Sequence, residues 1–280
     1  MTVGNAIILG LVQGISEFLP ISSSGHLAIL HNLLGMSDLE NGHLFFDVLL
    51  HFGTLIAICF MYWNDIVAMF TELADLIKGR KPAAPKPGKK PYSAARMFLL
   101  ICAATLPLVL ILPVNDYIDM LTGKTFFVGI ALVLTGFILY VADKMKVGKK
   151  NESSMRFTDA LIIGLCQCVA TLPGLSRSGT TITAGIATGQ NRNYAVKFSL
   201  LMSIPAVLGA TLLELVKAFK AGIVASLIPA YLIGMIAAMV SGVAAIMLIR
   251  YIVNKGKFGG FSYYCWVVGT LTIILSLIFG

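Results

Sequence analysis

The chain has 280 residues, of which 58% are hydrophobic and 12% are charged, and its formal net charge is +8. Soluble domains carry about 25% charged residues, so this composition excludes a soluble globular protein and predicts an integral membrane protein with room for about six spans of ~20 residues. The basic residues lie in loops between apolar segments, which is typical of residues that orient a membrane protein, and we expect no nucleic-acid partner.

The cysteines are interpreted as packing residues, because each of them lies in an apolar segment. Cys166 and Cys168 are two positions apart and therefore do not share a helix face. We expect neither a disulfide framework nor a cysteine metal site.

The first apolar segment, residues 2–16, is interrupted by a polar run, Glu17-Phe18-Leu19-Pro20-Ile21-Ser22-Ser23-Ser24-Gly25-His26. Both this segment and the following one, residues 27–35, are too short to cross about 30 Å of hydrocarbon. Hydrocarbon cannot hydrogen-bond a carboxylate, hydroxyls and an imidazole, so protein or a water-filled cavity has to surround them. We expect a re-entrant hairpin over residues 2–35, with a broken ordinary span as the alternative.

The remainder of the first half contains full-length apolar segments. We predict spans at residues 44–63, 97–113 and 125–142. Residues 64–77 have the pattern of an amphipathic surface helix, and the basic, proline-rich linker 78–91 should be cytoplasmic.

Shorter features separate these spans. The loop 36–43 carries Asp38 and Glu40 and no basic residue, and Pro107 is expected to kink the second span. The last two spans of this half are joined by a short acidic connection that contains Asp116 and Asp119.

The second half repeats the pattern of the first after a basic loop at residues 143–157. We place the boundary there, with one repeat at 1–150 and the other at 151–280. A second re-entrant hairpin is expected at residues 158–190, around the polar run Pro173-Gly174-Leu175-Ser176-Arg177-Ser178-Gly179-Thr180-Thr181. Spans follow at about residues 197–216, 227–249 and 261–279.

The two polar runs align, with Ser22 on Ser176, Ser24 on Ser178 and Gly25 on Gly179. Placing the basic loops in the cytoplasm makes the first half begin outside and the second half begin inside. The predicted fold is an all-α polytopic membrane protein, an inverted repeat of two halves that each contain one re-entrant helical hairpin and three transmembrane helices. The hairpin tips then meet near the midplane and form one composite site.

The first tip offers two candidate pairs of catalytic side chains. Gln13 and Glu17 are four residues apart on one helix face, where they could hold a divalent cation or orient a proton-transfer group. Ser23 and His26 are three residues apart, so they could form a nucleophile and its base. The alternatives are a structural glutamate, a serine cap and a buried histidine without catalytic work.

The second tip has the character of a phosphate site. Arg177 lies at a glycine-rich turn that opens a short helix, and its guanidinium, the neighbouring hydroxyls and free backbone N–H groups all donate to oxyanions. The predicted phosphate-binding residues of the two tips are Ser22, Ser24, Ser176, Ser178, Gly179, Thr180 and Thr181.

Gln13-x3-Glu17 through His26, together with Pro173 to Thr181, resembles the undecaprenyl-pyrophosphate phosphatase (bacitracin-resistance) family over the whole chain. The resemblance implies a membrane hydrolase that removes the terminal phosphate of undecaprenyl pyrophosphate and so recycles the lipid carrier of bacterial cell-wall synthesis. The acidic motif of the family falls on Gln13 and Glu17, its serine and histidine on Ser23 and His26, and its phosphate-binding arginine on Arg177. Many members have a glutamate at the position of Gln13, so Glu17 would carry more of the work here.

The resemblance also implies a divalent cation, Mg²⁺ or Ca²⁺, held by Gln13 and Glu17, and membrane lipids and a homodimer as further partners. It places the chain in the bacterial cytoplasmic membrane, with the site open to the outer side. The competing class is a lipid flippase or secondary transporter, because inverted repeats with discontinuous helices are also transporter architecture. A phosphatase of the acid-phosphatase type is discounted, because no histidine follows Ser176-Arg177 and no Lys-x6-Arg-Pro precedes it.

Overall fold

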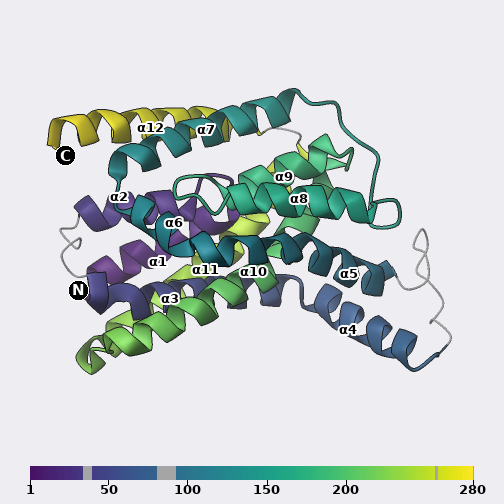
Figure 1. Cartoon of the computed structure of the whole chain (residues 1–280), viewed down its shortest axis with the longest axis horizontal. Coiled ribbons are helices and arrows are strands. Elements are labelled where there is room, and N and C mark those ends of the chain that lie inside the picture. Colours follow the sequence, from purple (N-terminus) through teal and green to yellow (C-terminus); the bar gives the residue numbers. More distant parts are fainter. Residues whose placement is uncertain (34–39, 81–92, 256–257, 280) are drawn as a thin grey trace.

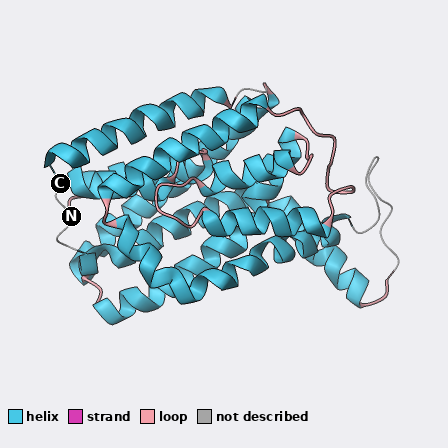
Figure 2. Ribbon diagram, turned by 45° about the horizontal axis from the view of Figure 1, so that its top comes forward, coloured by secondary structure: helices cyan, strands magenta, loops and turns pink. Residues whose placement is uncertain are grey.

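The computed structural model describes residues 1–33, 40–80, 93–255 and 258–279, and most of these residues are helical (Figures 1 and 2). The described residues form no strand, and one isolated bridge pairs Lys150 with Gln190. The all-α prediction is therefore confirmed.

Six segments of the described chain are long and apolar enough to cross a membrane. They are α3 (Glu40–Met61), α5 (Ser93–Thr105) with η2 (Leu106–Val114), α7 (Thr125–Lys144), α10 (Arg192–Ala221), η3 (Ala225–Leu227) with α11 (Ile228–Asn254), and α12 (Gly259–Phe279). Each overlaps one predicted span, so the chain is a polytopic membrane protein as expected.

Two pairs of shorter helices occupy the predicted hairpins. These are α1 (Val3–Phe18) with α2 (Ser23–Leu33), and α8 (Phe157–Val169) with α9 (Arg177–Ala187). At 1.5 Å per residue, the longest of the four reaches about 24 Å, which is less than the ~30 Å hydrocarbon core of a bilayer.

A serine caps the second helix of each pair, in keeping with the alternative of a serine cap at the first tip and the short helix expected at Arg177. Ser22 Oγ accepts the N–H of Gly25 at 3.3 Å, and Ser176 Oγ accepts the N–H of Gly179 at 3.0 Å. A capping hydroxyl satisfies an N–H that would otherwise have no partner in the first turn. The same hydrogen bond therefore occurs at aligned positions of the two tips.

Helices from different halves of the chain pack closely through small residues. Gly10 of α1 lies against the backbone of Gly234 in α11, and a Cβ added to Gly14 would lie 2.7 Å from the backbone nitrogen of Gly242. Close approach through glycine is how helices gain packing energy where no hydrophobic effect drives them together. Reciprocally, Gly164 of α8 lies against Ala104 of α5. The short helix of each half thus packs against a span of the other half, as expected of two intertwined halves. Their opposite orientation in the membrane stays a prediction.

The core is centred on the inner ends of the hairpin helices. Phe18, Leu100, Ile163, Phe198 and Ile246 are all buried in one cluster contributed by both halves. The helices α7 and α12 lie side by side along one edge of the molecule (Figure 1). The tips are thus held inside the bundle.

Three details concern the connections. At Pro107 the span changes from α-helix to 3₁₀ helix, because α5 stops at Thr105 and Pro107 lies in the first turn of η2, where its missing N–H costs little; the kink stays a prediction. The connection that follows is not a short loop but contains the helix α6 (Asn115–Thr122). The expected amphipathic helix is α4 (Trp63–Ile77), whereas Asp38 and most of the 78–91 linker lie outside the described residues.

Candidate active site

The two hairpin tips touch each other, as predicted. Ser178 Oγ donates to the carbonyl oxygen of Leu19 at 3.1 Å, and the N–H of Gly174 donates to Ser24 Oγ at 3.4 Å. Gly174 has φ +89°, a conformation that favours glycine, and it lies against Gly25 of the other tip. The tips therefore form one composite structure.

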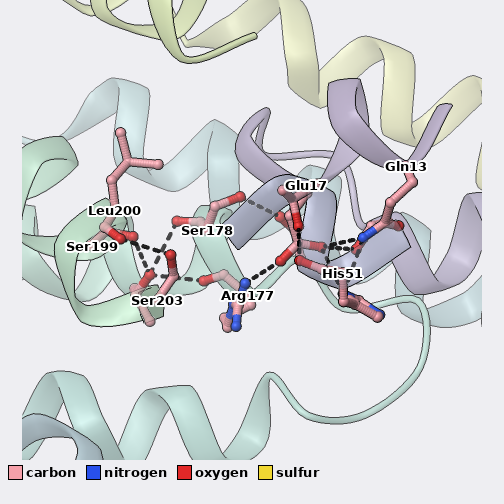
Figure 3. Close-up of polar contacts among 12 residues, drawn as sticks. Gln13, Glu17, His51, Arg177, Ser178, Ser199, Leu200 and Ser203 are labelled. Carbon is pink, nitrogen blue, oxygen red and sulfur yellow. Dashed lines mark hydrogen bonds and ion pairs between the residues drawn. The ribbon is translucent and has the colours of Figure 1, made fainter. Parts of the chain in front are cut away.

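Glu17 lies at the centre of this structure (Figure 3). Its Oε2 accepts hydrogen bonds from Ser23 Oγ at 2.7 Å and from Gln13 Nε2 at 3.1 Å, while its Oε1 pairs with Arg177 Nη2. Glu17 is only 7% exposed, so this ion pair and these hydrogen bonds replace the water that a carboxylate needs. The structure thus brings together four of the predicted site residues.

His51 of α3 completes this group, and the sequence analysis missed it. Its Nδ1 lies 3.1 Å from Gln13 Nε2 and 4.0 Å from Glu17 Oε2. Because the amide nitrogen of Gln13 only donates, Nδ1 accepts and the proton of a neutral His51 lies on Nε2. The signal was available: a histidine inside an apolar span marks a functional position by default.

A cavity of about 120 Å³ opens beside Glu17. A site needs only about 10–15 Å³ of such volume to hold one water molecule, so this cavity has room for several waters or a small polar group. Its walls come from both tips and from α3 and α10, and its lining residues are Ser16, Glu17, Ser22, Ser23, Ser24, His51, Ala170, Leu175, Ser176, Arg177, Ser178, Val207 and Ala210. The one positive side chain of this lining set is that of Arg177.

Four of the predicted phosphate-binding residues line the cavity, and three do not. The lining residues are Ser22, Ser24, Ser176 and Ser178. Thr181 Oγ1 instead donates to the carbonyl of Arg177 at 2.8 Å and contacts Ser199 Oγ at 2.6 Å, so it braces α9 against α10. The N–H of Gly179 is used in the cap by Ser176, and Thr180 is also absent from the lining.

The predicted hydrogen bond between Ser23 and His26 is wrong. Ser23 donates to Glu17, whereas His26 Nδ1 lies 2.7 Å from the carbonyl oxygen of Ser22 and His26 Nε2 lies 2.8 Å from Tyr264 Oη. The carbonyl of Ser22 points along α2, where it accepts the backbone N–H of His26 at 3.3 Å and meets the imidazole as well, and Ser22 itself adopts a positive φ of +71°. A positive φ is uncommon for a residue other than glycine and is concentrated at functional sites.

Comparisons with known proteins agree with this site. Residues 6–271 match the family described as bacitracin resistance protein BacA. The chain belongs to this BacA family. Proteins named undecaprenyl-diphosphatase are similar over the full length: that of Alkaliphilus metalliredigens is 40% identical over 99% of this chain and 100% of its own, and that of Methanosphaera stadtmanae is 39% identical over 98% of both chains. The undecaprenyl-diphosphatase of Carboxydothermus hydrogenoformans is 39% identical over 97% of this chain and 96% of its own.

The side-chain oxygens of Gln13 and Glu17 in this BacA family site are suited to bind a divalent cation, with a substrate phosphate as a further ligand. Gln13 Oε1 is buried and has no hydrogen-bond partner among the described residues, so it can still act as a ligand beside the carboxylate of Glu17. The described residues contain no group of three or more His, Cys, Asp or Glu side chains arranged for a metal. Mg²⁺ is commonly held in this manner, by one or two carboxylates, substrate phosphates and water.

Proposed function

We propose that this BacA family chain is an undecaprenyl-diphosphatase, which hydrolyses undecaprenyl pyrophosphate to undecaprenyl phosphate and phosphate. The observation that carries the proposal is the Glu17 cluster, in which a carboxylate, a serine hydroxyl and an arginine meet beside a cavity of about 120 Å³. Relatives that cover this chain along its whole length bear that name. The family name implies a role in resistance to bacitracin.

The terminal phosphoryl group of the substrate should replace Glu17 as the partner of Arg177. A guanidinium binds phosphate oxygens through two parallel hydrogen bonds, and it stabilises the charge that is spread over them in the transition state. The hydroxyl of Ser176, whose oxygen lies 3.2 Å from that of Ser178, can rotate to donate to the same group, while Ser178 keeps its bond to Leu19. The tail of the lipid remains among the apolar spans.

The residue placed to accept the proton of Ser23 is Glu17, because the hydroxyl of Ser23 already donates to it at 2.7 Å. As the Ser23 oxygen bonds to the terminal phosphorus, the bond from phosphorus to the bridging oxygen breaks and undecaprenyl phosphate leaves. Water then cleaves the phosphoserine, and phosphate is released with the serine regained. Attack by water, with Ser23 as a ligand, and attack by His26 are the alternatives.

A divalent cation bound by Glu17 and Gln13 would neutralise negative charge on the diphosphate. The role of the chain in that case is to fix the two oxygens four residues apart on α1, and Gln13 holds its position through its hydrogen bonds to Glu17 and His51. We propose Mg²⁺ or Ca²⁺ for this site.

The protein should reside in the cytoplasmic membrane of a bacterial cell, with its cavity open to the outer side. The basic loops support this orientation, because residues near 80, 150 and 255 are rich in lysine and arginine and would all face the cytoplasm. A homodimer stays a prediction.

Phosphate release from purified protein in detergent tests the function. The wild type should release phosphate from undecaprenyl pyrophosphate, and Arg177→Ala should lose about 10²–10⁴-fold, the scale on which positioned catalytic groups act. Asp75→Asn is the control, since Asp75 lies on α4, away from the tips. A wild type that releases no phosphate, but moves the lipid across a vesicle bilayer, would favour the transporter reading.

A further inference from the structure

His26 is fixed by hydrogen bonds at both of its ring nitrogens. Nδ1 lies 2.7 Å from the carbonyl oxygen of Ser22, and Nε2 lies 2.8 Å from Tyr264 Oη. The rings of His26 and Tyr264 are nearly parallel, at 6°, with centroids 5.6 Å apart. Tyr264 belongs to α12, the last helix of the chain, so this contact joins α12 to the first tip.

These two partners determine which tautomer the neutral imidazole adopts. A carbonyl oxygen can only accept, so Nδ1 carries the proton and donates it to Ser22. The lone pair of Nε2 is then free to accept the hydroxyl proton of Tyr264.

The same contact reaches the residues that present Ser23. The carbonyl of Ser22 accepts both the backbone N–H of His26, at 3.3 Å, and the imidazole Nδ1–H, and Ser22 is the residue with the strained positive φ. Next to Tyr264, Cys265 is fully buried with its Sγ 3.9 Å from the carbonyl oxygen of Pro20. Two consecutive residues of α12 therefore contact the first tip. Tyr264 contacts the side chain of His26, and Cys265 contacts the carbonyl of Pro20.

We propose that Tyr264 is a positioning residue of the phosphatase site, which holds His26 with Nε2 as its unprotonated nitrogen and thereby keeps the first tip in the conformation that aims Ser23 at Glu17. The inference rests on the proposed function, but its structural part can be tested without it. In the absence of substrate, Tyr264 donates to the lone pair of Nε2; a water molecule that donates to Nε2 would replace this hydroxyl, while the bond to Ser22 keeps the ring in place.

The first test is ¹⁵N spectroscopy of histidine-labelled protein in detergent at about pH 8.5, where a histidine with an ordinary pKa of about 6.5 is neutral. The chain has four histidines, so the signals of His26 can be assigned from their loss in His26→Gln. We expect a protonated Nδ1 and an unprotonated Nε2, and we expect the Nε2 resonance to move in Tyr264→Phe. A wild-type His26 with its proton on Nε2, or an Nε2 resonance that Tyr264→Phe leaves unchanged, overturns the proposal.

The second test is turnover of Tyr264→Phe, which keeps the ring and removes only the hydroxyl. Since one hydrogen bond contributes a modest net amount, kcat should fall about 2- to 10-fold with KM little changed. The matched control is Tyr263→Phe, because the ring of Tyr263 packs edge-on against Trp266, 5.6 Å away at 85°, and should leave turnover unchanged.

An unchanged kcat in Tyr264→Phe, or an equal loss in Tyr263→Phe, would overturn the positioning role. If the wild type itself releases no phosphate, the proposed function fails, and the tautomer measurement still decides whether Tyr264 positions His26.

Discussion

Glu17 and Arg177 form an ion pair across the two hairpin tips, although 160 positions separate them in the chain. Both belong to short helices that end inside the bundle, Glu17 near the end of α1 and Arg177 at the start of α9. A buried carboxylate without a cation would be costly, so in the absence of substrate the guanidinium of Arg177 compensates the negative charge of Glu17. The ion pair therefore keeps the carboxylate of Glu17 and the guanidinium of Arg177 side by side before the substrate binds.

We expect the Arg177→Lys variant to be defective in phosphate release. An ammonium keeps the positive charge but cannot form two parallel hydrogen bonds to a phosphoryl group, so kcat should fall about 10²-fold or more. Phosphate release is the measurement, and Arg80→Lys is the matched control because Arg80 lies beyond α4, on the exposed surface. Turnover close to that of the wild type would show that charge alone suffices and that Arg177 does not clamp the phosphate.

Ser23→Ala and Glu17→Gln should both abolish most of the turnover, because the hydroxyl and the carboxylate that accepts its proton act as a unit. The double variant should then be no worse than either single one. A phosphoserine trapped after acid quench, and its absence in Ser23→Ala, would show the covalent intermediate. Should Ser23→Ala keep most of its turnover while His26→Ala has none, the attacking group is His26 or water.

His51→Leu should weaken catalysis through Gln13. The leucine leaves a buried amide N–H of Gln13 without its acceptor, which costs roughly 1–3 kcal/mol and frees the Gln13 side chain to leave Glu17. We expect turnover to fall about 10-fold, with partial recovery in His51→Asn. Phe52→Leu, a change at the next residue, whose side chain is 43% exposed, serves as the control. Equal activities of His51→Leu and the control would remove His51 from the site.

Gly10→Ala should destabilise the fold, whereas Gly4→Ala on the same helix should not. A Cβ at Gly10 would lie 2.9 Å from the Cβ of Ala237 and collide with the backbone of α11, while one at Gly4 meets only Thr2 Oγ1, at 3.8 Å. Overpacking of this kind costs about 1–3 kcal/mol, so thermal unfolding in detergent should occur at a lower temperature for Gly10→Ala. Equal midpoints for the two variants would mean that α1 and α11 do not pack this closely.

Hydrophobic length and polar interruption were enough to predict the six spans and the two short helix pairs, since both follow from the thickness of a bilayer. The pairing of Glu17 with Arg177 was also within reach, because the two polar runs align in sequence and a composite site needs both. The change from α5 to the 3₁₀ helix η2 after Thr105 was missed, since proline permits either a kink or the end of an α-helix, and the helix α6 was missed as well.

The finer geometry of the first tip depends on tertiary contacts that cannot be predicted from the spacing of residues in the sequence. Ser23 and His26 are three residues apart and could share a face, but Ser22 turns its carbonyl toward the imidazole, and Tyr264 arrives from α12. His51 likewise reaches Gln13 only because α3 packs beside α1. Such partners lie far away in sequence and come together only in the fold.

The inverted orientation of the two halves can be tested by labelling single cysteines in a chain freed of its five native ones. Lys149→Cys and Lys255→Cys should react only from the cytoplasmic side, whereas Lys124→Cys and Lys220→Cys should react with an impermeant reagent added outside sealed cells. All four side chains are exposed, so accessibility depends on the side of the membrane and not on burial. The expected pattern follows from the concentration of basic residues in the loops near Lys149 and Lys255. Permeabilised cells, in which all four positions should react, are the control. Reaction of Lys149→Cys and Lys124→Cys from the same side would contradict the inverted repeat, because α7 would then not cross the membrane between them.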